Sequence, residues 1–251
     1  CSTDQSWCDL AAAEFQKLTG TRVLQTRKPT GEALAQLRAE SANPKTDLWW
    51  GGTGDPFLQA AELGLLEAYR PSYLQDLHSW SVRQLALSGN RVGGFYTSAI
   101  GFGWNTEVLR RKGLPAPKCW ADLLNPAYRG EIEISHPASS GTAYTILAGL
   151  VQLMGEESAF DYLKKLHRNV SQYTRSGTAQ APNVAKGEVA IGVSFFQQGR
   201  IECAGQRAAA EEGGLKAHPF LIGKTYHFNI KRISSNNPRP KLSINKGFCD
   251  S

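Results

Sequence analysis

Three short polar segments of this sequence place hydroxyl side chains or glycines directly before a predicted helix. They are Ser2-Thr3, Gly51-Gly52-Thr53-Gly54-Asp55-Pro56 and Ser139-Ser140-Gly141-Thr142. The backbone N–H groups of a glycine turn and of the first turn of a helix point outward, so they can bind an anion. Three such helix starts in one chain predict a site for a small anion.

A fourth polar turn, Arg175-Ser176-Gly177, adds a guanidinium group, which can bind a phosphate through two parallel hydrogen bonds. Each of these segments also has a purely structural interpretation. Arg175 can form a surface salt bridge, and Gly51-Gly52 can be only a tight turn. Ser139 and Ser140 can simply cap the following helix, which stabilises a helix by ~1 kcal/mol. The sequence leaves these alternatives open.

The order of predicted elements indicates an α/β protein. Helices are expected at 6–18, at 30–40 and from Asp55, the expected N-cap, and strands at 21–26, 48–50, 65–69 and 91–96 alternate with them. The extended run 100–104 breaks this alternation and is the candidate passage to a second lobe. Beyond it, helices are expected at 106–112, after Ser140 and at 156–166, and strands at 131–135 and 189–193.

Composition is that of a globular chain whose partners are anions. The chain has 251 residues, 41% hydrophobic and 20% charged, and no stretch approaches the roughly 18 apolar residues of a membrane helix. Its net charge is +6 and its pI is near 9.1. The basic residues are scattered, however, and Arg110-Arg111-Lys112 stands where cations favour a helix end, so nucleic acid is not an expected partner.

Motifs for catalysis are missing from the sequence. There is no Walker A loop, no GxSxG elbow and no HExxH pair, and the five histidines show no metal-ligand spacing. We therefore expect no enzyme activity, no cofactor and no metal site. Of the five cysteines, Cys1 and Cys8 flank a short loop and are a disulfide candidate that suits an oxidising compartment, and the others are expected to be buried thiols.

Four segments resemble, in this order, bacterial periplasmic solute-binding proteins of ABC importers, in the branch that binds ferric iron or hexose phosphates. They are Asp47–Pro56, Gly101–Asn105, Pro137–Tyr144 and Tyr173–Gly177, and the resemblance runs from Cys1 to about Gln206. It implies a type 2 periplasmic-binding-protein fold, with two α/β lobes joined by a strand hinge. The first lobe would hold 1–98 and 201–251, and the second lobe 99–200. Relatives normally begin with a core strand before Cys-Ser-Thr, and the sequence after Gln206 does not resemble theirs. We therefore expect an incomplete first lobe.

The resemblance also implies a function and a set of ligand contacts. The chain would be the periplasmic component of an ABC importer that delivers a small anionic solute, a phosphorylated sugar or phosphonate-like compound, to a membrane permease. It would act as a monomer in the periplasm, or outside the cytoplasm on a lipid anchor at its Cys-Ser start. The expected ligand residues are Ser2, Thr3, Gly52, Thr53, Gly54, Asp55, Ser139, Ser140, Gly141, Thr142, Arg175, Ser176, Phe196 and Gln197.

Two alternatives stay open at this point. Iron-binding relatives use a pair of adjacent tyrosines where this sequence has Phe195-Phe196, and phenylalanine offers a ferric ion no oxygen. Sugar-phosphate-binding relatives place His-Asp where Gln197-Gln198 stand, and glutamine can also bind sugar hydroxyls. The first alternative is a ferric-iron-binding protein with a synergistic anion. The second is a truncated relative without a working site.

Overall fold

The structure is a computed structural model and describes residues 1–195 and 220–222. The chain divides into two compact units, which are described separately. The first holds Cys1–Thr97, Ser135–Thr145 and Arg175–Gly177, and the second holds Ser98–Ile134, Ile146–Thr174 and the described residues from Thr178 onward. The predicted division into lobes 1–98 with 201–251 and 99–200 stays a prediction, because most of 201–251 lies outside the described residues.

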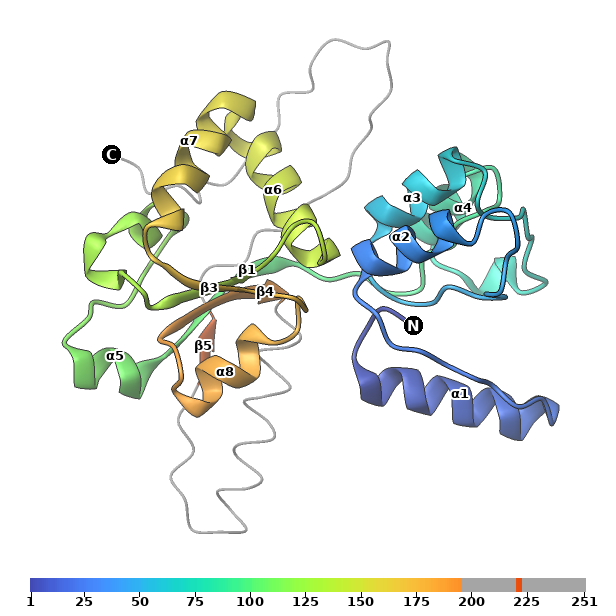
Figure 1. Ribbon diagram of the computed structural model, residues 1–251, viewed down its shortest axis with the longest axis horizontal. Coiled ribbons are helices and arrows are strands. Elements are labelled where there is room, and N and C mark those ends of the chain that lie inside the picture. The colour runs from blue at the N-terminus through green and yellow to red at the C-terminus, as the bar shows by residue number, and fades with distance from the viewer. Residues whose placement is uncertain (196–219, 223–251) are drawn as a thin grey trace. The chain divides into compact units, whose positions relative to one another are not determined.

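A mixed five-stranded sheet with strand order β3-β2-β4-β1-β5 is the centre of the second unit. β1 pairs antiparallel with β4 and with β5, whereas β2 pairs parallel with β4. Figure 1 shows α6 and α7 on one side of this sheet and α8 on the other. The elements are β1 (Ile100–Asn105), α5 (Thr106–Lys112), η2 (Trp120–Leu124), η3 (Pro126–Tyr128), β2 (Ile132–Ser135), α6 (Gly141–Met154), α7 (Glu156–His167), β3 (Val170–Thr174), α8 (Gln180–Lys186), β4 (Ile191–Phe195) and β5 (Phe220–Ile222).

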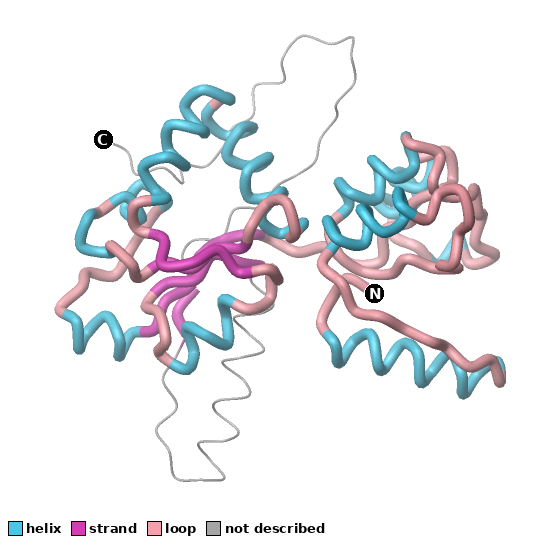
Figure 2. Tube along the Cα trace, in the orientation of Figure 1, coloured by secondary structure: helices cyan, strands magenta, loops and turns pink. Residues whose placement is uncertain are grey.

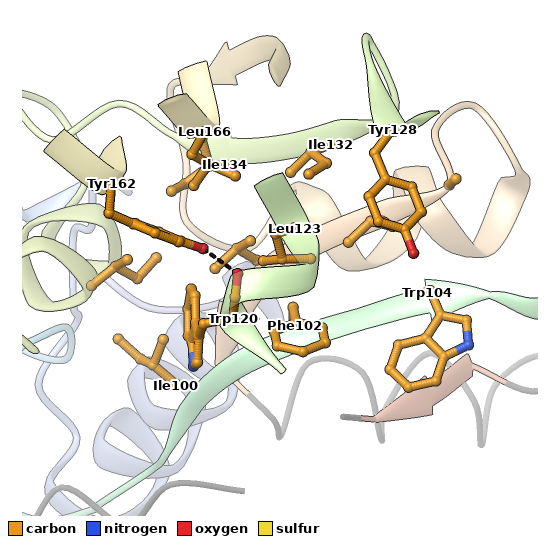
Figure 3. Packing of buried hydrophobic residues seen from close by; sticks show 14 of the residues in the cluster. Ile100, Phe102, Trp104, Trp120, Leu123, Tyr128, Ile132, Ile134, Tyr162 and Leu166 are labelled. Carbon is orange, nitrogen blue, oxygen red and sulfur yellow. Dashed lines mark hydrogen bonds between the residues drawn. The ribbon is translucent and has the colours of Figure 1, made fainter. Parts of the chain in front are cut away.

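The two faces of β1 carry side chains of different size, because successive residues of a strand point to opposite sides. Ile100, Phe102 and Trp104 enter the main hydrophobic core, together with residues of β2, β4, α6 and α7 (Figure 3). Glycine residues leave the other face of the sheet without bulky side chains. A Cβ on Gly192 of β4 would lie 2.9 Å from Cγ2 of Val184, so glycine allows α8 to pack directly on the sheet.

Two buried tyrosines tie the short 3-10 helices to this core. The hydroxyl of Tyr162 donates to the carbonyl of Trp120 over 2.7 Å (Figure 3), and that of Tyr128 donates to Pro115 over 2.6 Å. Burial raises the pKa of the Tyr162 hydroxyl. It also raises the pKa of Tyr128 to about 12, with a further contribution from the negative charge of Asp122.

Helices and loops alone make up residues 1–97, all of which the structure describes (Figure 2). The predicted strands at 21–26, 48–50, 65–69 and 91–96 were therefore wrong. A strand forms only where a neighbour pairs its N–H and C=O groups, and here single contacts such as Tyr69 N–H to Asn90 C=O (2.7 Å) join these segments. The helices are α1 (Gln5–Thr19), α2 (Thr30–Ala39), α3 (Gly54–Glu62), η1 (Leu74–Asp76) and α4 (Ser79–Leu87).

The first helix starts one residue earlier than expected, at Gln5, with Asp4 as its N-cap. Its apolar residues are largely exposed in the described part of the chain: Leu10 is 64% exposed and Leu18 is 81% exposed. Among the described residues, no helix has both the length and the apolar character needed to cross a membrane.

Candidate functional site

The N-terminal segment is held in place by a disulfide and by contacts with the loop before the glycine turn. Cys1 and Cys8 are joined, with their Cα atoms 6.0 Å apart. Between them, the Ser2 amide donates to the Trp50 carbonyl over 2.9 Å, and the indole N–H of Trp49 donates to the Ser2 hydroxyl over 2.8 Å. The disulfide and these two bonds fix the position of Ser2.

The predicted Cys1–Cys8 disulfide is confirmed, whereas the expectation for Cys119 was wrong. We expected thiols at the remaining cysteines, but Cys119 is also disulfide-bonded. The reason lies outside local sequence, because a bridge depends on which residues the fold brings together.

The glycine turn is packed so tightly that only glycine fits. Gly51 and Gly52 have φ of +76° and +109°, a region that side chains disfavour. A Cβ on Gly51 would lie 2.8 Å from Cγ2 of Thr3, and one on Gly52 would lie 2.2 Å from Cγ2 of Thr30. The Gly52 amide donates to the hydroxyl oxygen of Tyr96 over 2.9 Å, and the Tyr96 hydroxyl donates to the Gly52 carbonyl over 3.2 Å. The turn therefore contacts Thr3 directly.

Thr53 was predicted as a ligand residue, but the burial of its hydroxyl was not predicted. It is the N-cap of α3, which starts at Gly54 and not after Asp55 as predicted. Its side chain makes no cap hydrogen bond, and Oγ1 is buried without a hydrogen-bond partner in the described structure. A Cβ built on Gly141, the first residue of α6, would lie 2.0 Å from this oxygen. The starts of α3 and α6 are thus in contact at Thr53.

The third predicted segment, at the start of α6, contacts two other parts of the site. Ser139 donates its hydroxyl to the Arg175 carbonyl over 3.0 Å. Ser140 is only 2% exposed and Thr142 8%. A Cβ on Gly177 would lie 2.0 Å from the Thr142 hydroxyl oxygen and 2.8 Å from that of Ser140, so the turn after β3 closes over both hydroxyls.

Two predicted residues lie at the border of this cluster. Asp55 is exposed and accepts a hydrogen bond from the Thr145 hydroxyl at 3.3 Å. Gly54 has no near neighbour for an added Cβ except the Gln84 amide nitrogen, at 3.4 Å. Phe196 and Gln197 lie outside the described residues.

Three basic residues, Arg27, Lys28 and Arg175, give the site its positive charge. Arg175 forms a two-pronged ion pair with Glu32, its Nε and Nη2 donating to separate carboxylate oxygens. This hydrogen bonding, with further help from the positive charges of Arg175, Lys28 and Arg27, holds the pKa of Glu32 below its ordinary value, although burial opposes the shift. Arg27 donates to the Thr3 carbonyl over 3.0 Å and to the Ser176 hydroxyl over 2.9 Å.

The turn that connects these parts, Thr30-Gly31-Glu32 at the start of α2, was not among the predicted site segments. The Thr30 hydroxyl, on a residue that is 4% exposed, accepts from the Gly141 amide over 2.8 Å. The Gly31 amide donates to the Ser139 carbonyl over 3.0 Å. A signal was present, because this is a fourth polar, glycine-containing helix start of the kind already used to identify the other three.

A cavity of about 900 Å³ is lined by residues within 37–96, among them Gly51, Gly52 and Gly54 of the glycine turn. Its walls are mainly apolar and include two stacked aromatic pairs, Trp49 with Phe57 and Trp50 with Phe95, whose ring centroids are 3.8 Å and 4.9 Å apart. In the described residues, no group of three or more His, Cys, Asp or Glu could hold a metal ion.

Residues 43–220 match the family described as bacterial extracellular solute-binding protein. The chain belongs to this family. An uncharacterised protein of Haemophilus influenzae is 42% identical over 203 residues, which are 80% of this chain and 59% of that protein. A putative 2-aminoethylphosphonate-binding periplasmic protein of Salmonella typhimurium is 26% identical over 75% of this chain and 52% of its own length. The chain thus spans between half and three fifths of these curated relatives.

Several solved structures share the fold of this chain. AfuA of Actinobacillus pleuropneumoniae, with exogenous fructose-6-phosphate bound, superposes with a TM-score of 0.77 at 39% identity, covering 89% of this chain and 67% of AfuA. The periplasmic binding protein P5PA gives 0.79 at 37% identity, with the same coverage. Iron-bound HitA of Pseudomonas aeruginosa gives 0.67 at 20% identity, over 88% of this chain and 67% of HitA. The predicted α/β type 2 periplasmic-binding-protein fold is confirmed, and the relatives point to a location outside the cytoplasm.

Proposed function

We propose that this chain acts as the solute-binding component of an ABC importer and binds a small phosphorylated or phosphonate-type anion. The observation that carries the proposal is the convergence of the predicted hydroxyls and helix starts within one compact unit, around the unpartnered Thr53 hydroxyl. Hydroxyl groups and helix N-termini are strong donors for the oxygens of an anion. The AfuA structure with exogenous fructose-6-phosphate bound and the relative named as a putative 2-aminoethylphosphonate-binding periplasmic protein support the phosphoryl class.

The proposed ligand set joins contributions from four parts of the sequence. Ser2 and Thr3, the turn at 52–54, the start of α6 at 139–142 and the pair Arg175-Ser176 are the predicted contacts, and Arg27 joins them on structural grounds. Because the Arg27 guanidinium group already donates to the Ser176 hydroxyl, we expect it to bind the same anion. Phe196 and Gln197 remain sequence-based candidates for the non-anionic part of the solute.

Thermal unfolding in the presence of candidate ligands tests this function. Fructose 6-phosphate, glucose 6-phosphate and 2-aminoethylphosphonate should raise the melting temperature, and glucose should not. At 100 times the dissociation constant, a bound ligand adds about 2.7 kcal/mol, which is about 5–10 °C for a chain of this size. A Ser140→Ala variant should lose most of the shift, whereas Ser41→Ala, at an exposed serine after α2, should retain it.

Three further observations on the same protein separate the alternatives. Recovery of the ligand unchanged after incubation agrees with binding without catalysis, and turnover of a phosphate ester would contradict it. A visible charge-transfer band on addition of ferric citrate, without a shift by any phosphoryl compound, would favour the ferric-iron alternative. No shift with any of these compounds would refute the proposed function. We further propose that the chain acts as a monomer and that its partner is the membrane permease of the importer.

A further inference from the structure

The guanidinium group of Arg175 is already engaged, by a carboxylate of the same unit. Glu32 lies in the first turn of α2, and Arg175 follows β3, 143 residues away. Nε and Nη2 of Arg175 each donate to a different oxygen of Glu32. This parallel pair of bonds is also the geometry in which arginine binds a phosphoryl group. Glu32 therefore occupies the edge of Arg175 that would otherwise bind the anion.

The charges around Glu32 can be counted from the structure. Arg27, Lys28 and Arg175 act on its carboxylate, and they favour its ionised form. Arg27 reaches the site itself, through the Thr3 carbonyl and the Ser176 hydroxyl. Three cations and one carboxylate leave the cluster with two net positive charges near neutral pH. Without the carboxylate, the cluster would carry three.

Given the proposed function, on which this inference rests, we propose that Glu32 is a specificity-determining residue. Its carboxylate limits the positive charge of the site, and it competes with the solute for Arg175. The cost of this competition is the same for every solute that binds there. The repulsion is not, because it grows with the number of negative charges on the solute. Glu32 therefore weakens the binding of a dianion more than that of a monoanion.

A pair of isosteric esters measures the effect directly. Glucose 6-phosphate is mainly a dianion at pH 8, because its second pKa is about 6, whereas glucose 6-sulfate stays a monoanion. Isothermal titration calorimetry of wild type and Glu32→Gln should show tighter binding in the variant, by about 3-fold for the sulfate ester and about 10-fold for the phosphate ester. The second factor is larger because the repulsion doubles with the charge on the ester, whereas the cost of competing for Arg175 is the same for both esters.

Two further variants separate charge from position. Glu32→Asp keeps the negative charge but shortens the side chain, so its affinities should stay near wild type if charge is decisive. Glu40→Gln removes a carboxylate at the other end of α2, where Gln36 donates to it, and should change neither affinity. Because the Glu32–Arg175 pair is partly exposed, Glu32→Gln should melt within a few degrees of wild type.

Each outcome decides the proposal. If Glu32→Gln binds both esters more weakly, Glu32 only positions Arg175. If it binds both more tightly by the same factor, Glu32 competes for Arg175 without discriminating between charges. Either result overturns the proposal. If Glu32→Asp matches Glu32→Gln, geometry and not charge is responsible, and the proposal also fails. Binding of neither ester by wild type would instead refute the proposed function, and this inference with it.

Discussion

The contact between the starts of α3 and α6 makes a sharp prediction for Gly141→Ala. Alanine is normally the better helix residue, so this change in a 14-residue helix would be expected to stabilise it. Here the new methyl group would lie 2.0 Å from the Thr53 hydroxyl oxygen and 2.2 Å from that of Thr30. Both distances are shorter than any real carbon–oxygen contact, so the local structure must move.

The expected size of the effect follows from three contributions. Overpacking in a close contact typically costs about 1–3 kcal/mol. Displacing Thr30 also breaks its hydrogen bond from the Gly141 amide, and a lost bond of this kind costs about 1 kcal/mol. Helix propensity returns at most about 1 kcal/mol. The net expectation is a loss of about 2 kcal/mol, or about 4–8 °C in melting temperature for a chain of this size.

Gly54→Ala is the matched control, because Gly54 is also the first residue of a helix in the same unit. A Cβ there would meet only the side-chain nitrogen of Gln84 at 3.4 Å, an ordinary contact. This variant should gain about 0.5–1 kcal/mol through helix propensity and reduced freedom of the unfolded chain. The two substitutions are chemically identical, so the predicted difference in sign isolates the contact with Thr53 and Thr30.

Circular dichroism melts and urea unfolding of both variants measure these values. Combining Gly141→Ala with Thr53→Ala should recover about 1 kcal/mol relative to the sum of the single changes, because one of the two clashes disappears. A Gly141→Ala protein that melts at or above the wild-type temperature would show that Thr53 and Gly141 are not in contact. A site assembled from these helix starts would then be refuted as well.

Two predictions concern stability elsewhere in the chain. Replacing Cys1 and Cys8 together by serine should lower the free energy of unfolding by about 2–3 kcal/mol in the chain-entropy account, since their bridge closes a loop with a sequence separation of 7, and an unchanged urea midpoint would contradict this. Because burial raises the folded-state pKa of Tyr128 to about 12, its contribution is complete below pH 10 and is lost as the pH rises towards 12, by about 2–3 kcal/mol. Urea unfolding at pH 9, 10 and 11 should show this decline in the free energy of unfolding. In Tyr128→Phe the free energy should fall less steeply with pH, and an equal pH dependence in the two proteins would refute the assignment.

Local signals in the sequence located most helices and the strands β1, β2 and β4 of the second unit, but not β3 or β5. The helix at 106–112 was predicted with the bounds that the structure has, because Asn105 accepts from the amides of Glu107 and Val108 and Gly113 ends the helix in the left-handed conformation. Such caps are set by neighbours in sequence. The strands expected in residues 1–97 failed for the opposite reason, since an apolar run becomes a strand only if a distant segment pairs with it.

The candidate site shows the same division between local and long-range information. The hydroxyl-bearing helix starts could be predicted, because serine, threonine and glycine are favoured there for local reasons. That they form one site was also expected, but the contacts that join them were not, because these run through one turn, Thr30-Gly31-Glu32, whose three residues bind the Gly141 amide, the Ser139 carbonyl and the Arg175 guanidinium group. These contacts span more than 100 residues of sequence, and only a fold can specify them. The same turn holds the start of α6 through the Thr30 hydroxyl and the predicted anion-binding Arg175 through the Glu32 carboxylate. Site assembly and site charge therefore depend on two different residues of one turn, and substitutions of Thr30 and of Glu32 should affect them separately.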